Sequence, residues 1–140
     1  MSPPVVVDTN VWSVLFSGQR RRRDQTDGWT ELLLGRTVII ATQTRAEVLA
    51  GLFALGDTRR MSIRQQLDQT PTIPVDELVI QRFARLTHAC CERGDALGAK
   101  EHTGDRWIAA TALAVDAPLL SDDRIFDHDP DLNLLGRASD

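Results

Sequence analysis

Four acidic residues that lie far apart in the sequence could act together on metal ions. Each follows a predicted strand or lies in the first turns of a predicted helix; they are Asp8, Glu47, Asp105 and Asp123. Four carboxylates in one cleft repel one another and lose solvation, unless protons or bound cations offset their charge. Mg²⁺ and Mn²⁺ prefer such oxygen ligands. Two of these cations can activate water, hold a phosphate and stabilise the leaving oxygen of an in-line displacement, so no histidine base is needed.

Short apolar runs must position these acids. Strands are expected at residues 5–7, 37–40 and 118–121, where valine, isoleucine and leucine are bounded by proline or polar residues. A last short strand is expected at residues 133–135. Residues 70–75 are expected to be extended, because each proline there disfavours helix in the residue before it.

Helices are expected between the strands, since apolar residues recur there at helical spacing. Their expected positions are 11–16, 29–34, 44–55, 58–69, 76–93 and 105–115, with Gly56 ending the third and Gly94 the fifth. Strands separated by helices argue for a three-layer α/β/α domain with a central, mostly parallel sheet. The binding crevice of such a sheet lies outside the carboxyl ends of its strands, where the four acids are expected to meet.

Length and composition indicate one globular domain at residues 1–140. Of the 140 residues 42% are hydrophobic, and no apolar stretch is long enough to span a bilayer. The N-terminus lacks the features of a secretory signal, so we expect a cytoplasmic protein without a membrane partner. The neighbours Cys90 and Cys91 are badly placed to bridge each other and are expected to be reduced thiols.

The charge balance does not favour a simple nucleic-acid-binding protein. Sixteen Lys and Arg against 20 Asp and Glu give a net charge of −4, whereas a basic surface is typical of such proteins. Cations held by the acidic cluster would reverse its local charge and weaken this objection. The arginine run at residues 20–23 is either a phosphate contact or a solvated loop.

Aromatic and histidine residues suggest no further site. Trp12, Trp29 and Trp107 lie among apolar residues and are expected to anchor the core or an interface rather than stack on bases. The histidines show no zinc-ligand spacing.

Four segments carry the acids in a characteristic order. They are VVVDTN at residues 5–10, TRAEVLAG at 44–51, GDRWIAATAL at 104–113 and LLSDDRIF at 119–126. Together they resemble the PIN-domain family, specifically toxins of the VapC type. The resemblance covers nearly the whole chain, and the four motifs occur in the family's order.

The resemblance implies a metal site with Mg²⁺, or Mn²⁺ in its place. Asp8 and Asp105 match the principal ligands, and Glu47 and Asp123 match the acids that complete the site. Asn10 and Ser121 match polar positions that help to shape it. The last acidic position of the family usually lies two residues after Thr or Ser, which selects Asp123 and leaves the adjacent Asp122 as the alternative.

The resemblance also implies a function and partners. It implies a metal-dependent ribonuclease that acts as the toxin of a toxin–antitoxin pair, with RNA as substrate, a cognate antitoxin protein as partner and a homodimeric state. The apolar stripe of Val48, Leu49, Leu52 and Phe53 offers a groove for a partner helix.

Other functions fit the residues less well. A receiver domain would have an adjacent acidic pair after the first strand and a late lysine, but Asp8 is followed by Thr9, and the only lysine is Lys100. A phosphatase of the aspartyl-phosphate type would need a carboxylate where Asn10 stands. A PIN-like binding module without catalysis would not need all four acids.

Overall fold

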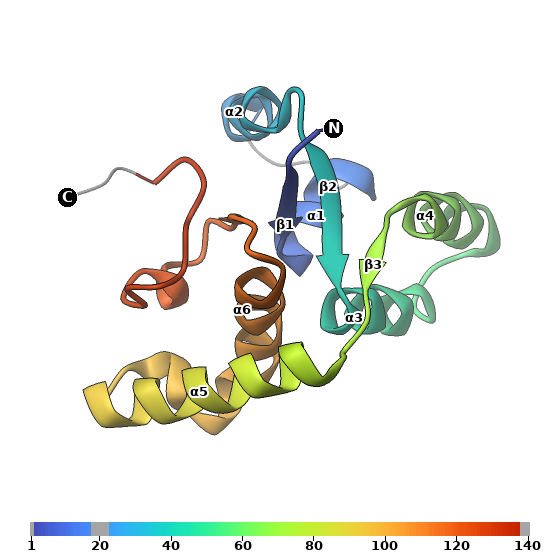
Figure 1. Cartoon of the computed structure of the whole chain (residues 1–140). Coiled ribbons are helices and arrows are strands. Elements are labelled where there is room, and N and C mark those ends of the chain that lie inside the picture. Colours follow the sequence, from blue (N-terminus) through green and yellow to red (C-terminus); the bar gives the residue numbers. More distant parts are fainter. Residues whose placement is uncertain (1, 18–22, 138–140) are drawn as a thin grey trace.

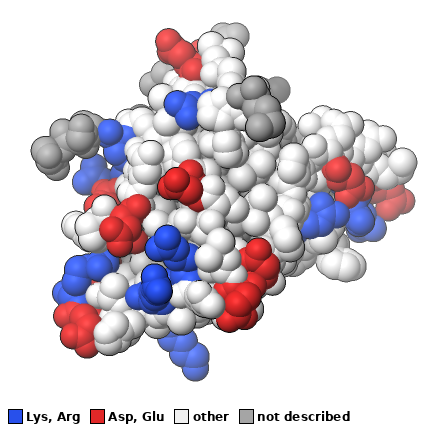
Figure 2. Space-filling view, in the orientation of Figure 1, with Lys and Arg blue, Asp and Glu red and all other residues white. Residues whose placement is uncertain are grey.

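The computed structural model describes residues 2–17 and 23–137, without the side chains of residues 23–25 (Figure 1). The arginine run at residues 20–23 therefore lies outside the side chains described. Within the described part of the chain, no helix combines the length and the apolarity that a membrane span requires. On the face shown in Figure 2, basic and acidic side chains are interspersed, and no broad basic surface is present there.

A sheet of four parallel strands lies at the centre of the described residues. Its strands are β1 (Pro4–Val7), β2 (Thr37–Ala41), β3 (Thr72–Ile73) and β4 (Leu119–Leu120), in the spatial order β3-β2-β1-β4. In the register, Val6 of β1 lies opposite Ile39 on one side and Leu119 on the other. Because all four strands run the same way, the residues that follow β1, β2 and β4 meet at one edge of the sheet.

Helices cover both faces of this sheet (Figure 1). They are α1 (Thr9–Phe16), α2 (Arg23–Leu33), α3 (Thr42–Leu52), α4 (Asp57–Gln69), α5 (Glu77–Arg93) and α6 (Thr103–Val115). Three short 3₁₀ helices lie at η1 (Ala96–Gly98), η2 (Lys100–His102) and η3 (Arg124–Phe126). Gly94 ends α5 in the left-handed conformation with φ of 68°, as its position in the sequence predicted.

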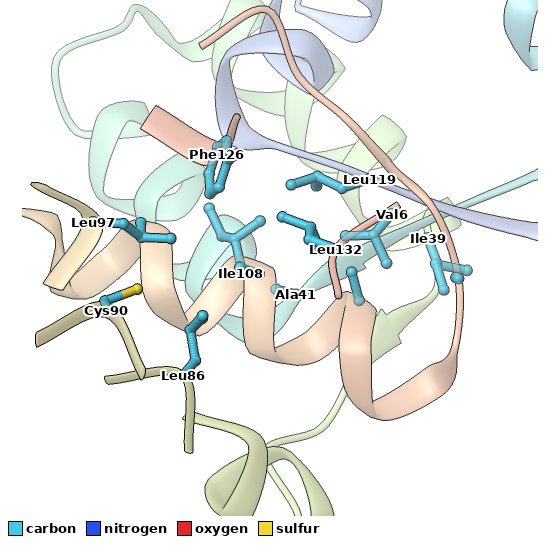
Figure 3. Packing of buried hydrophobic residues seen from close by; sticks show 13 residues of the cluster. Val6, Ile39, Ala41, Leu86, Cys90, Leu97, Ile108, Leu119, Phe126 and Leu132 are labelled. Carbon is cyan, nitrogen blue, oxygen red and sulfur yellow. The ribbon is translucent and has the colours of Figure 1, made fainter. Parts of the chain in front are cut away.

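Alternate residues of β1 pack into two apolar layers, one on each face of the sheet. Val6 packs with side chains of α5 and α6, including Leu86 and Ile108 (Figure 3). Val5 and Val7 belong to the other layer, which contains side chains of α1 to α4. A strand buried on both faces needs a continuous apolar sequence, which residues 5–7 supply. The predicted three-layer α/β/α architecture is therefore confirmed, and every strand pair is parallel.

Two predictions about element boundaries were wrong. Residues 133–135 form no strand, and Leu134 makes only an isolated parallel bridge with Leu119. The neighbouring strand β4 is only two residues long, so it offers few backbone groups for pairing. Gly56 does not end the third helix. Instead α3 ends at Leu52, and Gly56 is the N-cap of α4 in an extended conformation, a position that glycine fills readily.

The predictions for Trp12, Trp29 and the thiols are confirmed. Trp12 and Trp29 are buried in the core, and the ring of Trp107 stacks on that of Phe83 with centroids 3.8 Å apart. Cys90 and its neighbour are free thiols.

Candidate active site

A cavity of about 370 Å³ opens at the carboxyl edge of the sheet. Its lining residues are Asp8, Thr9, Asn10, Glu47, Asp105, Ile108, Asp122 and Asp123. The structure thus brings all four predicted acids to one cavity and adds a fifth, Asp122. None of the described residues that line it is Lys or Arg, so the cavity has a strongly acidic lining.

Asp8 is the most buried of these acids, with 6% of its surface exposed. It follows β1 and caps α1, where one carboxylate oxygen accepts a hydrogen bond from the backbone N–H of Val11 at 2.9 Å. Burial raises its pKa to about 6, against the lowering effect of its hydrogen bonds with Ser121 and Val11, and the charges of Asp122 and Asp123 raise it further. A cation beside Asp8 would therefore relieve a real electrostatic cost.

Ser121 joins the ends of β1 and β4. Its hydroxyl donates to the second carboxylate oxygen of Asp8, across a separation of 113 residues in the sequence. The Ser121 oxygen also accepts the backbone N–H of Asp123 at 3.0 Å. One buried side chain thus fixes both the Asp8 carboxylate and the backbone that carries Asp123.

Glu47 reaches the cavity from α3, and both of its oxygens are held. The Thr9 hydroxyl donates to Oε2, and the Gln43 amide donates to Oε1 at 2.9 Å. Gly104 of α6 leaves the space for this arrangement, since a Cβ there would lie 2.9 Å from Gln43 Nε2 and 3.3 Å from Glu47 Oε1. A side chain at position 104 would therefore press on the Gln43 and Glu47 side chains.

Asp105 lies in the first turn of α6 and contacts a histidine. Its Oδ2 is 2.9 Å from Nδ1 of His102. The neighbouring Arg106 is buried and donates to the backbone oxygens of Leu97 and Ala99 at 2.7 Å each. Arg106 therefore anchors the segment that leads into α6 and fixes the helix end from which Asp105 projects.

Asp122 and Asp123 both line the cavity but have different local roles. Asp122 accepts a hydrogen bond from the Asn10 side-chain amide at 3.2 Å. Asp123 accepts from the backbone N–H of Ile125 at 3.0 Å and so caps η3. The geometry brings both acids to the cavity.

The donor set of the cavity fits a hard divalent cation, although the acids point toward protein partners. Each predicted acid engages a hydrogen-bond partner, and the described residues contain no group of three or more His, Cys, Asp or Glu side chains arranged to hold a metal ion. The five acids supply only oxygen donors, as Mg²⁺ and Mn²⁺ prefer. The hydrogen bonds of Asp8 and Glu47 leave lone pairs of the carboxylate oxygens for a cation in the cavity.

Three residues that contact the acids were not predicted as site residues from the sequence. Gln43 lies four residues before Glu47, and His102 lies three before Asp105. Helical neighbours three or four apart share a face, so this spacing was a usable signal. The contact of Thr9 with Glu47 joins α1 to α3 and depends on helix packing, which spacing does not show.

Comparisons with known proteins identify the family. The PIN-domain family model matches residues 5–130. This chain belongs to the PIN-domain family. The resemblance found in the four motifs is thereby confirmed, and the receiver and phosphatase alternatives are excluded. A comparison with curated proteins gives no significant match.

Solved structures share this PIN fold. VapBC2 from Rickettsia felis, bound to a DNA fragment from its promoter, matches with a TM-score of 0.75 and 18% identity, over 94% of this chain and 96% of that one. FitAcB from Neisseria gonorrhoeae gives 0.73 and 22%, over 94% and 96%. VapBC-5 from Mycobacterium tuberculosis, a member of the VapBC toxin–antitoxin family, gives 0.69 and 24%, over 94% and 97%. At these identities the likeness shows the fold.

Proposed function

We propose that this PIN-domain chain is a metal-dependent ribonuclease and the toxin of a toxin–antitoxin pair. One observation carries the proposal: five carboxylates, one of them buried, line a single cavity at the carboxyl edge of a parallel sheet, and none of the described lining residues is basic. Membership of the PIN-domain family supports it. The substrate in this proposal is RNA.

Four acids would hold Mg²⁺, or Mn²⁺ in its place. They are Asp8, Glu47, Asp105 and Asp123, with Asn10 and Ser121 in support. When bound, such cations neutralise the charge that develops on phosphate oxygens and lower the pKa of water that they bind. The choice of Asp123 over Asp122 comes from the motif, in which the last acid follows two residues after Ser121.

The chain's own side chains prepare this cavity for a phosphodiester. Ser121 and the Val11 amide orient the Asp8 carboxylate, and Thr9 with Gln43 holds both oxygens of Glu47. Donors that are fixed before the substrate arrives need little reorganisation during the reaction.

A cognate antitoxin is the proposed protein partner. Solved structures of the same fold include a toxin–antitoxin complex from Klebsiella pneumoniae, at 22% identity and a TM-score of 0.67 over 91% of this chain and 94% of that one. We also propose, from the motif resemblance, that the chain forms a homodimer.

An apolar cavity between α3 and α4 is the proposed antitoxin surface. It measures about 670 Å³ and is lined by Leu49, Leu52, Phe53, Arg60, Met61, Arg64 and Gln65. Of the predicted stripe, Leu49, Leu52 and Phe53 line this cavity, whereas Val48 is buried in the core and does not. Phe53 is 86% and Met61 66% exposed. Exposed apolar side chains around a groove are typical of a site for a partner helix.

A PIN-like binding module without catalysis is the second candidate. The observation in its favour is that the acids are bonded to protein partners and do not converge on one point within the described residues. The two candidates differ in what they do to RNA when a cation is supplied.

Cleavage of purified cellular RNA tests the proposal. The protein is incubated with RNA and Mg²⁺ or Mn²⁺, with EDTA as control, and the fragment ends are mapped by sequencing. We expect cation-dependent cuts at a limited set of sites, which would also identify the substrate. RNA that stays intact with both cations would favour the binding module.

A further inference from the structure

A second cavity lies between the C-terminal end of α5 and η3. It measures about 580 Å³, and three basic side chains, Arg93, Arg124 and His128, are among its lining residues. Asp123 lines the acidic cavity and the next residue, Arg124, lines this one. Consecutive Cα atoms are about 3.8 Å apart, so residues adjacent in the chain contribute to the linings of both cavities.

Two of the three basic side chains of this cavity have no acidic partner among the described residues. Arg93 lies 3.3 Å from Asp95, whose side chain is only 4% exposed, and that pair is balanced. The side chains of Arg124 and His128 are exposed, and neither forms a hydrogen bond or ion pair with residues 2–17 or 23–137 as far as their side chains are described. Their donors are therefore available to an anion.

We propose that this cavity binds a backbone phosphate of the RNA strand whose neighbouring phosphate lies in the acidic cavity. The inference rests on the proposed function and adds a substrate-positioning site to it. An arginine fork pairs with two phosphate oxygens at once, and such contacts fix the register of a strand without reading its sequence.

The acidic lining of the first cavity favours such a contact. Its lining is acidic, the whole chain carries −4, and acidic and basic groups are interspersed on the face seen in Figure 2. RNA that approaches the acids therefore needs positive charge nearby, and Arg124 is adjacent in the chain to a proposed metal ligand. Free phosphate has the same oxyanion chemistry, so the test separates the two sources.

The experiment measures binding in EDTA, where cleavage plays no part. Inorganic phosphate and a short single-stranded RNA are titrated separately, followed by amide shifts in NMR spectra and, for RNA, by fluorescence anisotropy at several salt concentrations. The variants are Arg124→Ala and the double variant Arg124→Ala with His128→Ala. The matched control is Arg36→Ala, since Arg36 directly precedes β2 and so lies at the opposite edge of the sheet.

We expect both ligands to shift the NMR signals of the backbone amides at residues 93–96 and 124–128. We also expect RNA to bind more tightly than phosphate. For Arg124→Ala the slope of log affinity against log salt should fall by about 0.7, the value for one phosphate contact of a single strand. Arg36→Ala should bind RNA like the wild type.

Three results would overturn the inference: equal RNA binding by the Arg124 and Arg36 variants, no shift at residues 124–128 with RNA, or phosphate binding there without RNA binding. Failure of the proposed ribonuclease activity would be separate. A chain that binds RNA through Arg124 but leaves it intact with Mg²⁺ and Mn²⁺ would retain the phosphate site and lose the catalytic function.

Discussion

The Ser121 hydroxyl donates a hydrogen bond to the carboxylate of Asp8, which ties the end of β4 to the end of β1 at the floor of the acidic cavity. The bond helps to hold a carboxylate whose pKa burial has raised to about 6. The charged form of Asp8 is thus costly to the fold, and this cost is what a bound cation would remove.

Asp8→Asn should stabilise the metal-free protein near neutral pH. An acid whose pKa rises from 3.8 to about 6 on folding binds its proton more tightly in the folded state, so stability falls as pH increases from about 4 to 6. The variant lacks this penalty. In EDTA at pH 7.5 its free energy of unfolding should exceed that of the wild type by up to about 3 kcal/mol, and at pH 4 the gain should disappear. Urea unfolding at both pH values measures it, and an equal gain at both would contradict the assignment.

Mg²⁺ should narrow this difference in stability. A cation that binds only the folded state stabilises it, by about 2.7 kcal/mol at a concentration of 100 times the dissociation constant. We expect the wild type to gain stability with Mg²⁺ and Asp8→Asn to gain much less, as measured by the shift of the urea midpoint. Equal gains would show that the cation binds away from Asp8.

Gly104→Ala should weaken cation binding while the fold persists. The new Cβ would lie 2.9 Å from Gln43 Nε2 and 3.3 Å from Glu47 Oε1, so the Gln43 side chain must move and release Glu47. Gly51→Ala in α3 is the matched control, because no atom lies within 4 Å of its Cβ; it should gain about 0.5–1 kcal/mol through helix propensity alone. Mg²⁺ titration by calorimetry compares the two, and unchanged affinity in Gly104→Ala would exclude the positioning role.

Neighbouring acids should differ in their effect on cleavage. Asp123→Asn should reduce the rate of RNA cleavage by at least about tenfold. Loss of a residue that only hydrogen-bonds to a metal ligand already costs about that much. Asp122→Asn should stay close to the wild type, since Asp122 contacts Asn10 and is not assigned as a ligand. Initial rates on a fixed RNA settle the choice, and the opposite order would make Asp122 the fourth acid.

Phe53, the exposed aromatic residue of the apolar cavity, should contribute to antitoxin binding but not to the stability of the fold. Phe53 is 86% exposed, so Phe53→Ser should change the free energy of unfolding by no more than about 0.5 kcal/mol. It should leave RNA cleavage unchanged and weaken binding of the cognate antitoxin. Leu78→Ser on α5 is the control, since Leu78 is 51% exposed but lies outside that cavity. Equal antitoxin affinity for both variants would place the partner elsewhere.

The sequence predicted the sheet and the meeting of the acids because both follow from local patterns. A central parallel strand is buried on both faces and must be apolar, as Val5, Val6 and Val7 are. Residues that follow parallel strands meet at one edge of the sheet. The sequence alone therefore predicted that Asp8 and Asp123 would line the same cavity, as they do. The family match over residues 5–130 agrees with the four motifs.

Features that depend on tertiary packing were not predictable in this way. The burial of Val48 and Leu52 against the sheet, while Phe53 stays outside, depends on the rotation of α3 about its axis. The use of Gly104 as a spacer for Glu47 depends on how closely α6 approaches α3. The basic cavity at Arg124 and His128 joins η3 to the end of α5, and no sequence pattern relates these segments.

Cleavage of single-stranded RNA by paired α6 variants tests the central claim most directly. Asp105→Asn removes a proposed ligand in the first turn of α6, and Asp116→Asn makes the same chemical change at the other end of the helix, where the left-handed Asp116 with φ of 54° tolerates asparagine. Initial rates are measured with Mg²⁺ and with EDTA. The account predicts cation-dependent cleavage by the wild type and Asp116→Asn, and none by Asp105→Asn; cleavage by Asp105→Asn at the wild-type rate would contradict it.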